Sequence, residues 1–369
     1  MSALSCQRAM FDIPAGVTYL NAAAMSPIPK AGRLAGEAGV FAKVQPWAID
    51  RNEGLVRTER VRGLVAGLIG AAADDIALTG ATSYGVSTAA LNVPVAAGSR
   101  ILVLAGEHPS QVLPWRERAT WAGAVVEEIA RPGDDDWAAA IIAAVRREGA
   151  GPVAVAALSP SHWTDGSVVD LDLIAPVLRE VGAALVIDAT QGVGVLDLDV
   201  GRLRPDFMAF PTYKWILGPY SFGFLYVAPW RQDGVPLEQH ENSRVKGAFM
   251  PGARRYDLGE RNNLILLPIA EAGLELVSGW GVTAIAARCR MLTDRIAAGA
   301  AGLGIGTAAN RVPHAVGLRF AGGIPAGLLE RLAAQGIYVA ERGGFLRVSP
   351  HVYNDAADVD RLLTALGAG

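Results

Sequence analysis

Cysteine is almost absent from this chain. Only 2 of its 369 residues are cysteines, Cys6 and Cys289, so a framework of disulfides is excluded. No residues are spaced like the ligands of a zinc cluster, and we therefore predict no metal site. Two isolated thiols are typical of a reducing compartment, and the first residues lack the apolar stretch behind a basic end that marks a secretory signal. We expect a cytoplasmic protein.

An excess of charge is also missing. The 33 basic and 36 acidic residues leave a net charge of −3, and no segment is a basic block. A partner with an anionic surface, whether nucleic acid or membrane, is therefore disfavoured. The stretch 76–99 carries no charge, but polar residues and glycines interrupt it far short of a membrane helix. A small molecule is the favoured partner.

The composition is that of a folded core. The chain is 51% hydrophobic, and its 43 glycines and 21 prolines are spread along its length, which is typical of a large domain with a smaller one. Strand-like apolar runs alternate with helix-length segments, and this rhythm predicts a parallel sheet. The strand-like runs are 76–79, 101–104, 153–158 and 184–188, and the helical segments include 134–147 and 171–181. The runs 207–210 and 222–227 follow each other closely and predict a pair of neighbouring strands.

The pattern of polar and apolar residues changes after about residue 229. A polar stretch over 232–261 precedes two long helical patterns and then a mixture of short strands and helices, which predicts a second, smaller α+β domain. The expected helices are 264–280, 282–303, 325–335 and a last one capped near Asn354, and the expected strands are 315–320, 337–339 and 345–349.

The most informative local feature is a lysine in a loop. Lys214, one of only 4 lysines, directly follows an apolar strand and lies in a segment punctuated by Gly218 and Pro219. Ligands of open α/β sheets bind near such strand ends. A solvated surface lysine is the ordinary alternative, but the neighbours Tyr213 and Trp215 favour burial. A buried lysine with a lowered pKa suits Schiff-base chemistry.

A carboxylate and an anion site are expected beside this lysine. Asp188 ends the strand 184–188 and would face the same crevice, although capping of the next turn is an even alternative. The segment 80–83 follows a strand and opens a helix, so its backbone N–H groups could hold a phosphate. The glycines Gly192 and Gly194 imitate a dinucleotide loop but lack its third glycine and its helix.

These segments, in this order, resemble the class V aminotransferase family of fold-type I pyridoxal phosphate enzymes, which includes cysteine desulfurases, kynureninase and isopenicillin N epimerase. The resemblance spans nearly the whole chain. It is carried by TYLNAA at 18–23, GATS at 80–83, EHPSQVLPW at 107–115, DGSVVDL at 165–171, DATQ at 188–191, YKWILGPYSFGFLYV at 213–227, PGARRYDLGERNN at 251–263 and FLRVSPHVYND at 345–355.

The resemblance implies a fold and its domains. We expect an α/β protein whose large domain holds a mainly parallel seven-stranded sheet flanked by helices, with a small α+β C-terminal domain. The large pyridoxal phosphate-binding domain would cover 21–255 and the small domain 256–369. The N-terminal segment 1–20 would pack near the small domain.

Family roles at the cofactor ring carry over residue by residue. Lys214 resembles the lysine that forms the internal aldimine and then moves the proton at the substrate Cα. Asp188 is similar to the aspartate that keeps the pyridine nitrogen protonated. Gln191 falls where the family hydrogen-bonds the phenolic oxygen. His108 falls where a ring stacks on the cofactor, and we count it among the catalytic residues with Lys214 and Asp188.

The resemblance also implies which residues bind the cofactor phosphate and which bind the substrate. Ala81 and Thr82 match the phosphate cradle, together with Tyr213. Arg347 resembles the arginine that binds the substrate α-carboxylate. Asn21 lies in the segment that lines the substrate side. Core packing and a domain salt bridge are the ordinary alternatives for Tyr213 and Arg347.

Two departures from the family bear on function. Desulfurases carry a nucleophilic cysteine on a loop before the carboxylate-binding arginine, but no cysteine lies between Ile337 and Arg347, so persulfide transfer is disfavoured. Where many relatives have a Gly-Thr pair that reaches the neighbouring subunit's phosphate, this chain has Gly259 and Glu260, which leaves that contact open.

We therefore expect a homodimeric pyridoxal phosphate enzyme that acts at the Cα of an amino acid, with its active site at the subunit interface. Transamination is favoured, and a β-lyase of the C–S type or an epimerase-like racemase is the alternative. An NAD-dependent oxidoreductase is a remote alternative that rests only on the strand rhythm and the two glycines. A catalytically silent protein of the same fold would not need a Schiff-base lysine.

Overall fold

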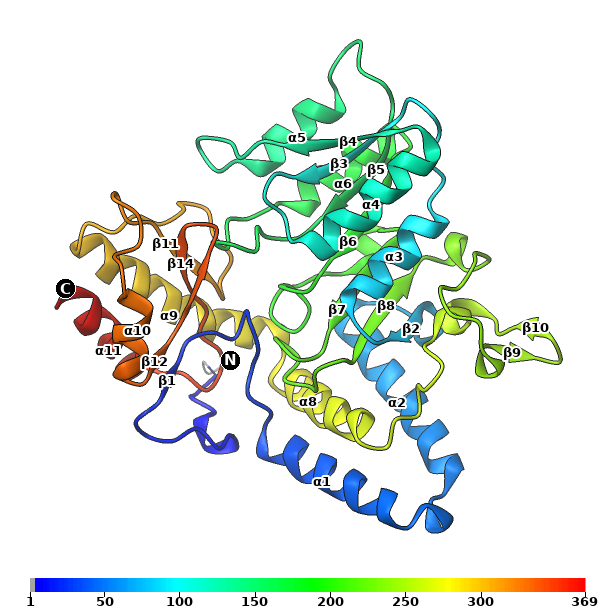
Figure 1. The fold of residues 1–369 in the computed structure, drawn as a ribbon, viewed down its shortest axis with the longest axis horizontal. Coiled ribbons are helices and arrows are strands. Elements are labelled where there is room, and N and C mark those ends of the chain that lie inside the picture. Colours follow the sequence, from blue (N-terminus) through cyan, green and yellow to red (C-terminus); the bar gives the residue numbers. More distant parts are fainter. Residues whose placement is uncertain (1–3, 369) are drawn as a thin grey trace.

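A seven-stranded sheet forms the centre of the larger part of the protein, in a computed structural model that describes residues 4–368 (Figure 1). Its strands are β2 (Ile76–Thr79), β3 (Arg100–Leu104), β4 (Val125–Ile129), β5 (Val153–Leu158), β6 (Ala184–Asp188), β7 (Phe207–Pro211) and β8 (Gly223–Val227). Their order across the sheet is β2-β8-β7-β6-β5-β3-β4, and only β8 runs against its neighbours. The predicted mainly parallel sheet and the neighbouring strand pair β7–β8 are confirmed.

Helices cover both faces of this sheet. α3 (Thr82–Asn92) and α4 (Pro109–Ala122) pack on one face, and α2 (Arg51–Ile69), α5 (Trp137–Val145), α6 (Leu171–Glu180) and α8 (Leu266–Trp280) share a core with the other. Strand residues alternate between the two cores: Leu102 and Leu104 face one, Ile101 and Val103 the other. Burial on both faces explains why these strands read as continuous apolar runs.

The C-terminal elements form a smaller unit beside the sheet. α9 (Val282–Gly302), α10 (Leu328–Ala334) and α11 (Ala356–Gly367) accompany an antiparallel sheet of order β11-β14-β13, made of β11 (Val316–Leu318), β13 (Ala340–Arg342) and β14 (Phe345–Val348). The predicted strand at 337–339 does not join this sheet. It is β12 (Ile337–Tyr338), which pairs in parallel with β1 (Thr18–Tyr19), so the N-terminal segment contacts the smaller unit.

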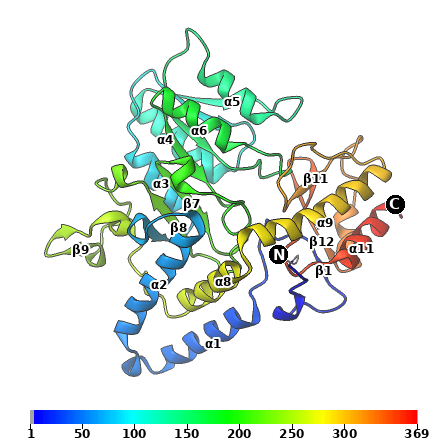
Figure 2. The ribbon, with the colours of Figure 1, turned by 180° about the vertical axis from the view of Figure 1, so that it is seen from behind.

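Helix α8 packs with the larger part of the molecule. It lies against α1 (Lys30–Val44) and α2, and its Leu267 and Leu274 belong to the core beneath the sheet. Figure 2 shows α9 leading away from it into the smaller unit, at a bend of 81°. By its packing, α8 belongs to the core of the larger part, while the domain bounds 21–255 and 256–369 stay a prediction.

The remaining elements are short. They are the hairpin β9 (Arg244–Val245) and β10 (Ala248–Phe249), the helix α7 (Val200–Leu203), and 3₁₀ turns at Arg8–Met10, Pro46–Ala48, Ala73–Asp75, Pro229–Arg231, Glu241–Ser243 and Gly252–Tyr256. Within residues 4–368 no single helix is long and apolar enough to cross a membrane, and only the bent pair α8 and α9 would meet that length and composition together.

Candidate active site

A cavity of about 360 Å³ opens where the parallel strands end. Loops after β2, β3, β5, β6 and β7 form its floor and walls, and the smaller unit closes it with residues of β13 and β14. This is the edge at which open α/β sheets bind ligands. Its lining comprises Ala23, Ala24, Gly80, Ala81, Thr82, Ser83, Glu107, His108, Ser110, Ser159, Ser161, Trp163, Asp188, Thr190, Gln191, Tyr213, Lys214, Tyr220, Ser221, Arg342 and Arg347.

The structure brings eight of the nine predicted site residues to this cavity: Ala81, Thr82, His108, Asp188, Gln191, Tyr213, Lys214 and Arg347. Asn21 is not among the lining residues. Its backbone bridges to Ser349 of the smaller unit, and its side-chain oxygen has no hydrogen-bond partner among the described residues. Ala23 and Ala24, a few residues further along, line the cavity instead. The role of Asn21 stays a prediction.

The loop that carries Lys214 is folded around one threonine. The Thr212 hydroxyl lies 2.7 Å from the carbonyl oxygen of Pro219 and 2.9 Å from that of Phe222, and it is fully buried. Leu217 and Ser221 adopt positive φ angles of 60°, a conformation that costs non-glycine residues energy. The surrounding contacts hold this strained loop so that Lys214 enters the cavity.

The cavity disfavours the charged form of the Lys214 side chain. Burial lowers the pKa of Lys214 to about 7, with the Arg347 charge acting in the same direction and Asp188 opposing it. Its Nζ lies 5.5 Å from the centre of the Tyr213 ring. At neutral pH a large fraction of this amine is therefore unprotonated, as a nucleophilic or proton-accepting lysine requires.

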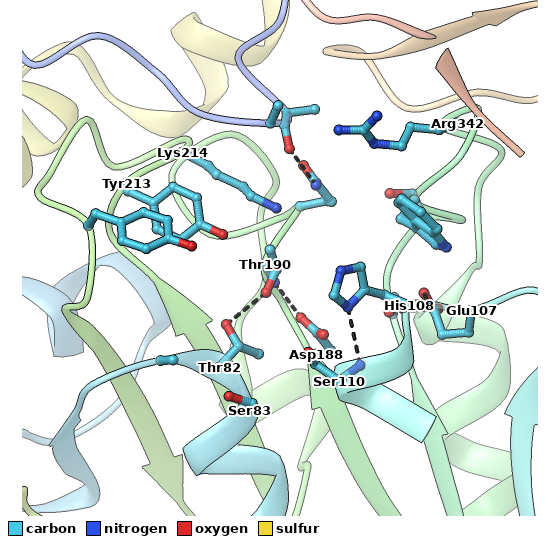
Figure 3. A pocket seen from close by; sticks show the side chains of 18 of the residues that line it. Thr82, Ser83, Glu107, His108, Ser110, Asp188, Thr190, Tyr213, Lys214 and Arg342 are labelled. Carbon is cyan, nitrogen blue, oxygen red and sulfur yellow. Dashed lines mark hydrogen bonds between the residues drawn. The ribbon is translucent and has the colours of Figure 1, made fainter. Parts of the chain in front are cut away.

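Asp188 is held by its own turn. Its Oδ1 accepts a hydrogen bond of 2.9 Å from the Thr190 N–H, and the Thr190 hydroxyl lies 2.9 Å from that of Thr82. Figure 3 shows Thr190 between Thr82 and Asp188, with Lys214 on one side and His108 on the other. The strand end and the start of α3 are thus linked through side chains.

Gln191 is engaged at both ends of its amide. Its Nε2 donates to the Ala23 carbonyl at 2.9 Å, and its Oε1 accepts from the Trp215 ring N–H at 2.9 Å. Trp215 in turn packs between His314 and His351, with ring centres 4.3 and 5.2 Å away. One proton of the Gln191 amide remains for a ligand.

His108 caps the helix that follows β3. Its Nδ1 accepts a 3.3 Å hydrogen bond from the Ser110 N–H, and its ring meets Trp163 edge-on at 5.2 Å. Burial is the main reason that the pKa of His108 falls below its usual value. A neutral imidazole that accepts at Nδ1 carries its proton on Nε2.

The start of α3 offers anion donors. Ala81 precedes the helix, and the N–H groups of its first turn, at Thr82 and Ser83, have no acceptor within the helix. A Cβ on Gly85 would lie 2.6 Å from that of Ala209 on β7, so a glycine lets the helix pack this closely on the sheet. In the loop between β7 and β8, the Tyr213 and Tyr220 rings lie 4.6 Å apart.

Arg347 is buried without an acidic partner. It is 2% exposed, donates through Nη1 to the Trp163 carbonyl at 2.7 Å, and leaves its buried Nε without a partner among the described residues. Burial and the nearby Arg342 lower the pKa of Arg347 to about 10. A bound carboxylate would satisfy this guanidinium.

Two charged lining residues were missed by the sequence reasoning. Glu107 is buried, accepts hydrogen bonds from the His108 N–H at 2.7 Å and from the Ser159 hydroxyl at 2.9 Å, and burial raises its pKa to about 7. Arg342 reaches the cavity from β13. Glu107 immediately precedes His108 in the sequence, so its position next to a predicted site residue could have identified it. Arg342 has no local sequence signature.

The structure also bears on the predictions for the glycines after β6, the cysteines and metal-binding side chains. Gly192 and Gly194 lie in a turn after β6, and the next helix, α7, begins only at Val200, so they form no dinucleotide loop. The remote oxidoreductase alternative therefore loses its local support. Neither cysteine lines the cavity, and burial raises the pKa of the Cys289 thiol to about 12. Among residues 4–368 no cluster of metal-binding side chains occurs.

Comparisons with known proteins agree with this geometry. The family description "Aminotransferase class-V" matches residues 52–362. A probable cysteine desulfurase of Pyrococcus abyssi is 34% identical over 46% of this chain, but the match spans only 42% of that protein. An isopenicillin N epimerase of Streptomyces clavuligerus is 27% identical over 95% of this chain and 94% of its own length. A solved cystine C–S lyase, in complex with its product cysteine persulfide, shares the fold with a TM-score of 0.85 at 21% identity, covering 96% of this chain and 98% of that one.

Proposed function

The chain belongs to the class V aminotransferase family, whose members depend on pyridoxal phosphate, and we propose that it is an enzyme acting at the Cα of an amino acid. The observation that carries the proposal is Lys214: an amine whose pKa is lowered to about 7, opening into the same cavity as Asp188. A lysine with a purely structural role would gain nothing from this burial.

The residues present fit the cofactor. Lys214 would hold its aldehyde carbon through Nζ, Asp188 its ring nitrogen, and His108 one face of its ring. Thr82 and the N–H groups at the start of α3 would hold its phosphate. When bound, pyridoxal phosphate supplies an electron sink that acidifies the Cα–H bond of an attached amino acid.

Three side chains of the cavity have separate roles in the proposed reaction. Arg347 holds the substrate α-carboxylate, because its buried Nε has no partner among the described residues. Lys214 accepts the proton from Cα and returns it, since an amine with a pKa near 7 can do both at neutral pH. Asp188, whose Oδ1 accepts the hydrogen bond from the Thr190 N–H, would hold the ring nitrogen of the cofactor through its carboxylate.

We propose transamination as the reaction, with elimination of the C–S lyase type as the second candidate. The second candidate is supported by the fold shared with the cystine C–S lyase. Persulfide transfer to an enzyme cysteine is disfavoured, because no cysteine lines the cavity and Cys289 is fully buried.

We also propose that the protein is a homodimer. An apolar groove borders α1, where Phe41 is 71% exposed and Val44 65%, and isolated soluble chains rarely expose such patches. Ala23 and Ala24 line the active cavity, and the next residues, Met25 and Ser26, line this groove. A second copy seated there would therefore lie beside the active site. Sedimentation of wild type and Phe41→Asp would test the dimer.

A cytoplasmic location completes the proposal. It rests on the two free cysteines and on the reducing compartment that they favour.

The central experiment is reduction of the purified protein with borohydride followed by peptide mapping. The cofactor should be found covalently attached to Lys214, and Lys214→Ala should abolish the adduct, while Lys30→Ala, at an exposed lysine on α1, should keep it. Labelling of another lysine would overturn the assignment. Titration with amino acids then separates the reactions: a visible band that is lost and returns with a keto acid indicates transamination, and accumulating pyruvate indicates elimination.

A further inference from the structure

We infer that the substrate is an amino acid with a second carboxylate on its side chain, which Arg342 binds while Arg347 holds the α-carboxylate. The inference rests on the proposed function, since it assumes that an amino acid occupies this cavity. It names a specificity-determining residue and a substrate class from the charges of the cavity.

Arg342 and Arg347 lie on the same face of the small sheet. In the antiparallel pair β13–β14, Ala340 is directly opposite Arg347, and Arg342 lies two residues further along β13. Directly opposed residues and their second neighbours point to the same side, and such diagonal pairs lie about 7–8 Å apart. Two guanidinium groups carried by residues at this separation can bind the two carboxylates of one short dicarboxylate.

Arg342 points into the cavity without an acidic partner. Figure 3 shows its guanidinium directed over the cavity from the side opposite Thr82 and Ser83. Its Nη1 donates to the neighbouring Glu341 carbonyl, and no described acidic side chain forms an ion pair with it or with Arg347. Its proximity is also visible in its lowering effect on the pKa of both Lys214 and Arg347.

Elsewhere in the molecule, the guanidinium groups of buried arginines have acceptors. Arg62 contacts Asp257 at 2.9 Å, and Arg100 contacts Glu127 at 2.8 Å. Arg288 has no acidic partner, but it donates to three backbone carbonyls, of Leu4, Val352 and Asn354. Arg347 differs from all three, because its buried Nε has no partner among the described residues and a charge withdrawn from water in this way is costly. A bound anion would remove that cost.

The acids that line the cavity are engaged elsewhere. Asp188 accepts from the Thr190 N–H, and Glu107 accepts from His108 and Ser159. The proposed phosphate cradle at Thr82 lies on the far side of Thr190 from Arg342 (Figure 3). The cofactor phosphate would therefore leave Arg342 free to bind an anionic group on the substrate side chain.

The test is binding of unreactive acids to the cofactor-loaded protein by calorimetry. Succinate, glutarate and adipate are compared with butyrate, valerate and hexanoate, which have the same lengths but one carboxylate. At least one dicarboxylate should bind about tenfold or more tightly than its partner, since a second charge-assisted, bidentate contact is gained.

Variants locate the second contact. Arg342→Gln should remove most of the dicarboxylate preference, and Arg342→Lys should keep part of it, because the charge remains but the planar fork is lost. The control Arg331→Gln, at an exposed position of α10, should behave as wild type. The cofactor absorption band should be unchanged in all three.

Two failures are distinguishable. A normal cofactor band with equal binding of both acid series, or with a preference that survives in Arg342→Gln, would overturn this inference alone. A protein that binds no cofactor at Lys214 would overturn it together with the proposed function. Thermal unfolding of each variant shows that a lost preference is not a lost fold.

Discussion

The two walls of the active cavity are built in different ways. On the large sheet, polar side chains follow buried strands and contact one another: Asp188 binds Thr190, Thr190 contacts Thr82, and Gln191 binds Trp215. On the small sheet, Arg342 and Arg347 come from one tight hairpin, and neither forms an ion pair with an acid within residues 4–368. The first wall is complete by itself, whereas the second is completed by what it binds.

This difference assigns the cofactor to one wall and specificity to the other. Groups fixed by mutual hydrogen bonds are preorganised and stabilise a ligand without rearrangement. Unpaired arginines gain most from a matching anion and reject a ligand that lacks it. The hairpin that presents them turns through Gly343 and Gly344 at φ angles of 55° and 83°, a region that favours glycine.

The largest expected effect tests the cofactor wall at Asp188. Asp188→Asn removes the carboxylate that would hold the ring nitrogen of the cofactor, so exchange of the substrate Cα proton should slow by about 10²–10³-fold. Attachment of the cofactor to Lys214 should persist. Deuterium exchange at Cα, followed by nuclear magnetic resonance, measures the effect, and Asp197→Asn, at an exposed carboxylate, is the matched control. An unchanged exchange rate would remove Asp188 from the chemistry.

A stability measurement examines the buried acid of the same wall. The pKa of Glu107 is raised to about 7, so the folded protein binds this proton more tightly than the unfolded chain. The stability that protonated Glu107 contributes is therefore fully present below the ordinary carboxyl pKa of 4.5 and is lost as pH rises through about 7. Glu107→Gln does not titrate, so its unfolding free energy lacks this pH-dependent loss. The difference in unfolding free energy, variant minus wild type, should increase by on the order of 3 kcal/mol between pH 5 and 8.

Urea unfolding at several pH values measures this difference. A gap between variant and wild type that stays constant from pH 5 to 8 would show that Glu107 is not a buried titrating group. Glu117→Gln on α4, at an exposed position, should show no such trend.

The substrate wall is examined at Arg347. Arg347→Lys keeps the charge but loses the planar fork, so the KM for amino acids should rise about 10- to 100-fold. The Kd of the cofactor should change little, because its proposed contacts lie on the other wall. An equal loss of cofactor affinity would contradict the division between the walls.

The smallest effect concerns pH. Because the pKa of Lys214 is about 7, its unprotonated fraction rises about tenfold between pH 6 and 8 and then levels off. The rate of covalent cofactor capture by the cofactor-free protein, followed by absorbance, should show the same rise and plateau. A rate that keeps rising towards pH 10 would indicate a solvated lysine with an ordinary pKa.

Much of the larger fold could be predicted because its strands are buried on both faces. β5 and β6 are continuous apolar runs and were located from the sequence. β4 was missed: it is an edge strand, Val125–Ile129, whose Glu127 and Glu128 break the apolar pattern. β13, at Ala340–Arg342, is short and polar and was missed for the same reason.

The sequence by itself determined the local parts of this protein: buried strands, and a lysine and an aspartate placed where strands end. These follow from short-range patterns, because burial and strand direction dictate which residue meets the crevice. Only the tertiary structure decided which distant segments share it. Arg342 reaches the cavity, and Asn21 does not line it, because the smaller unit packs across the strand ends. Packing between segments far apart in the chain has no local signature, and it decides which charges are left for the substrate.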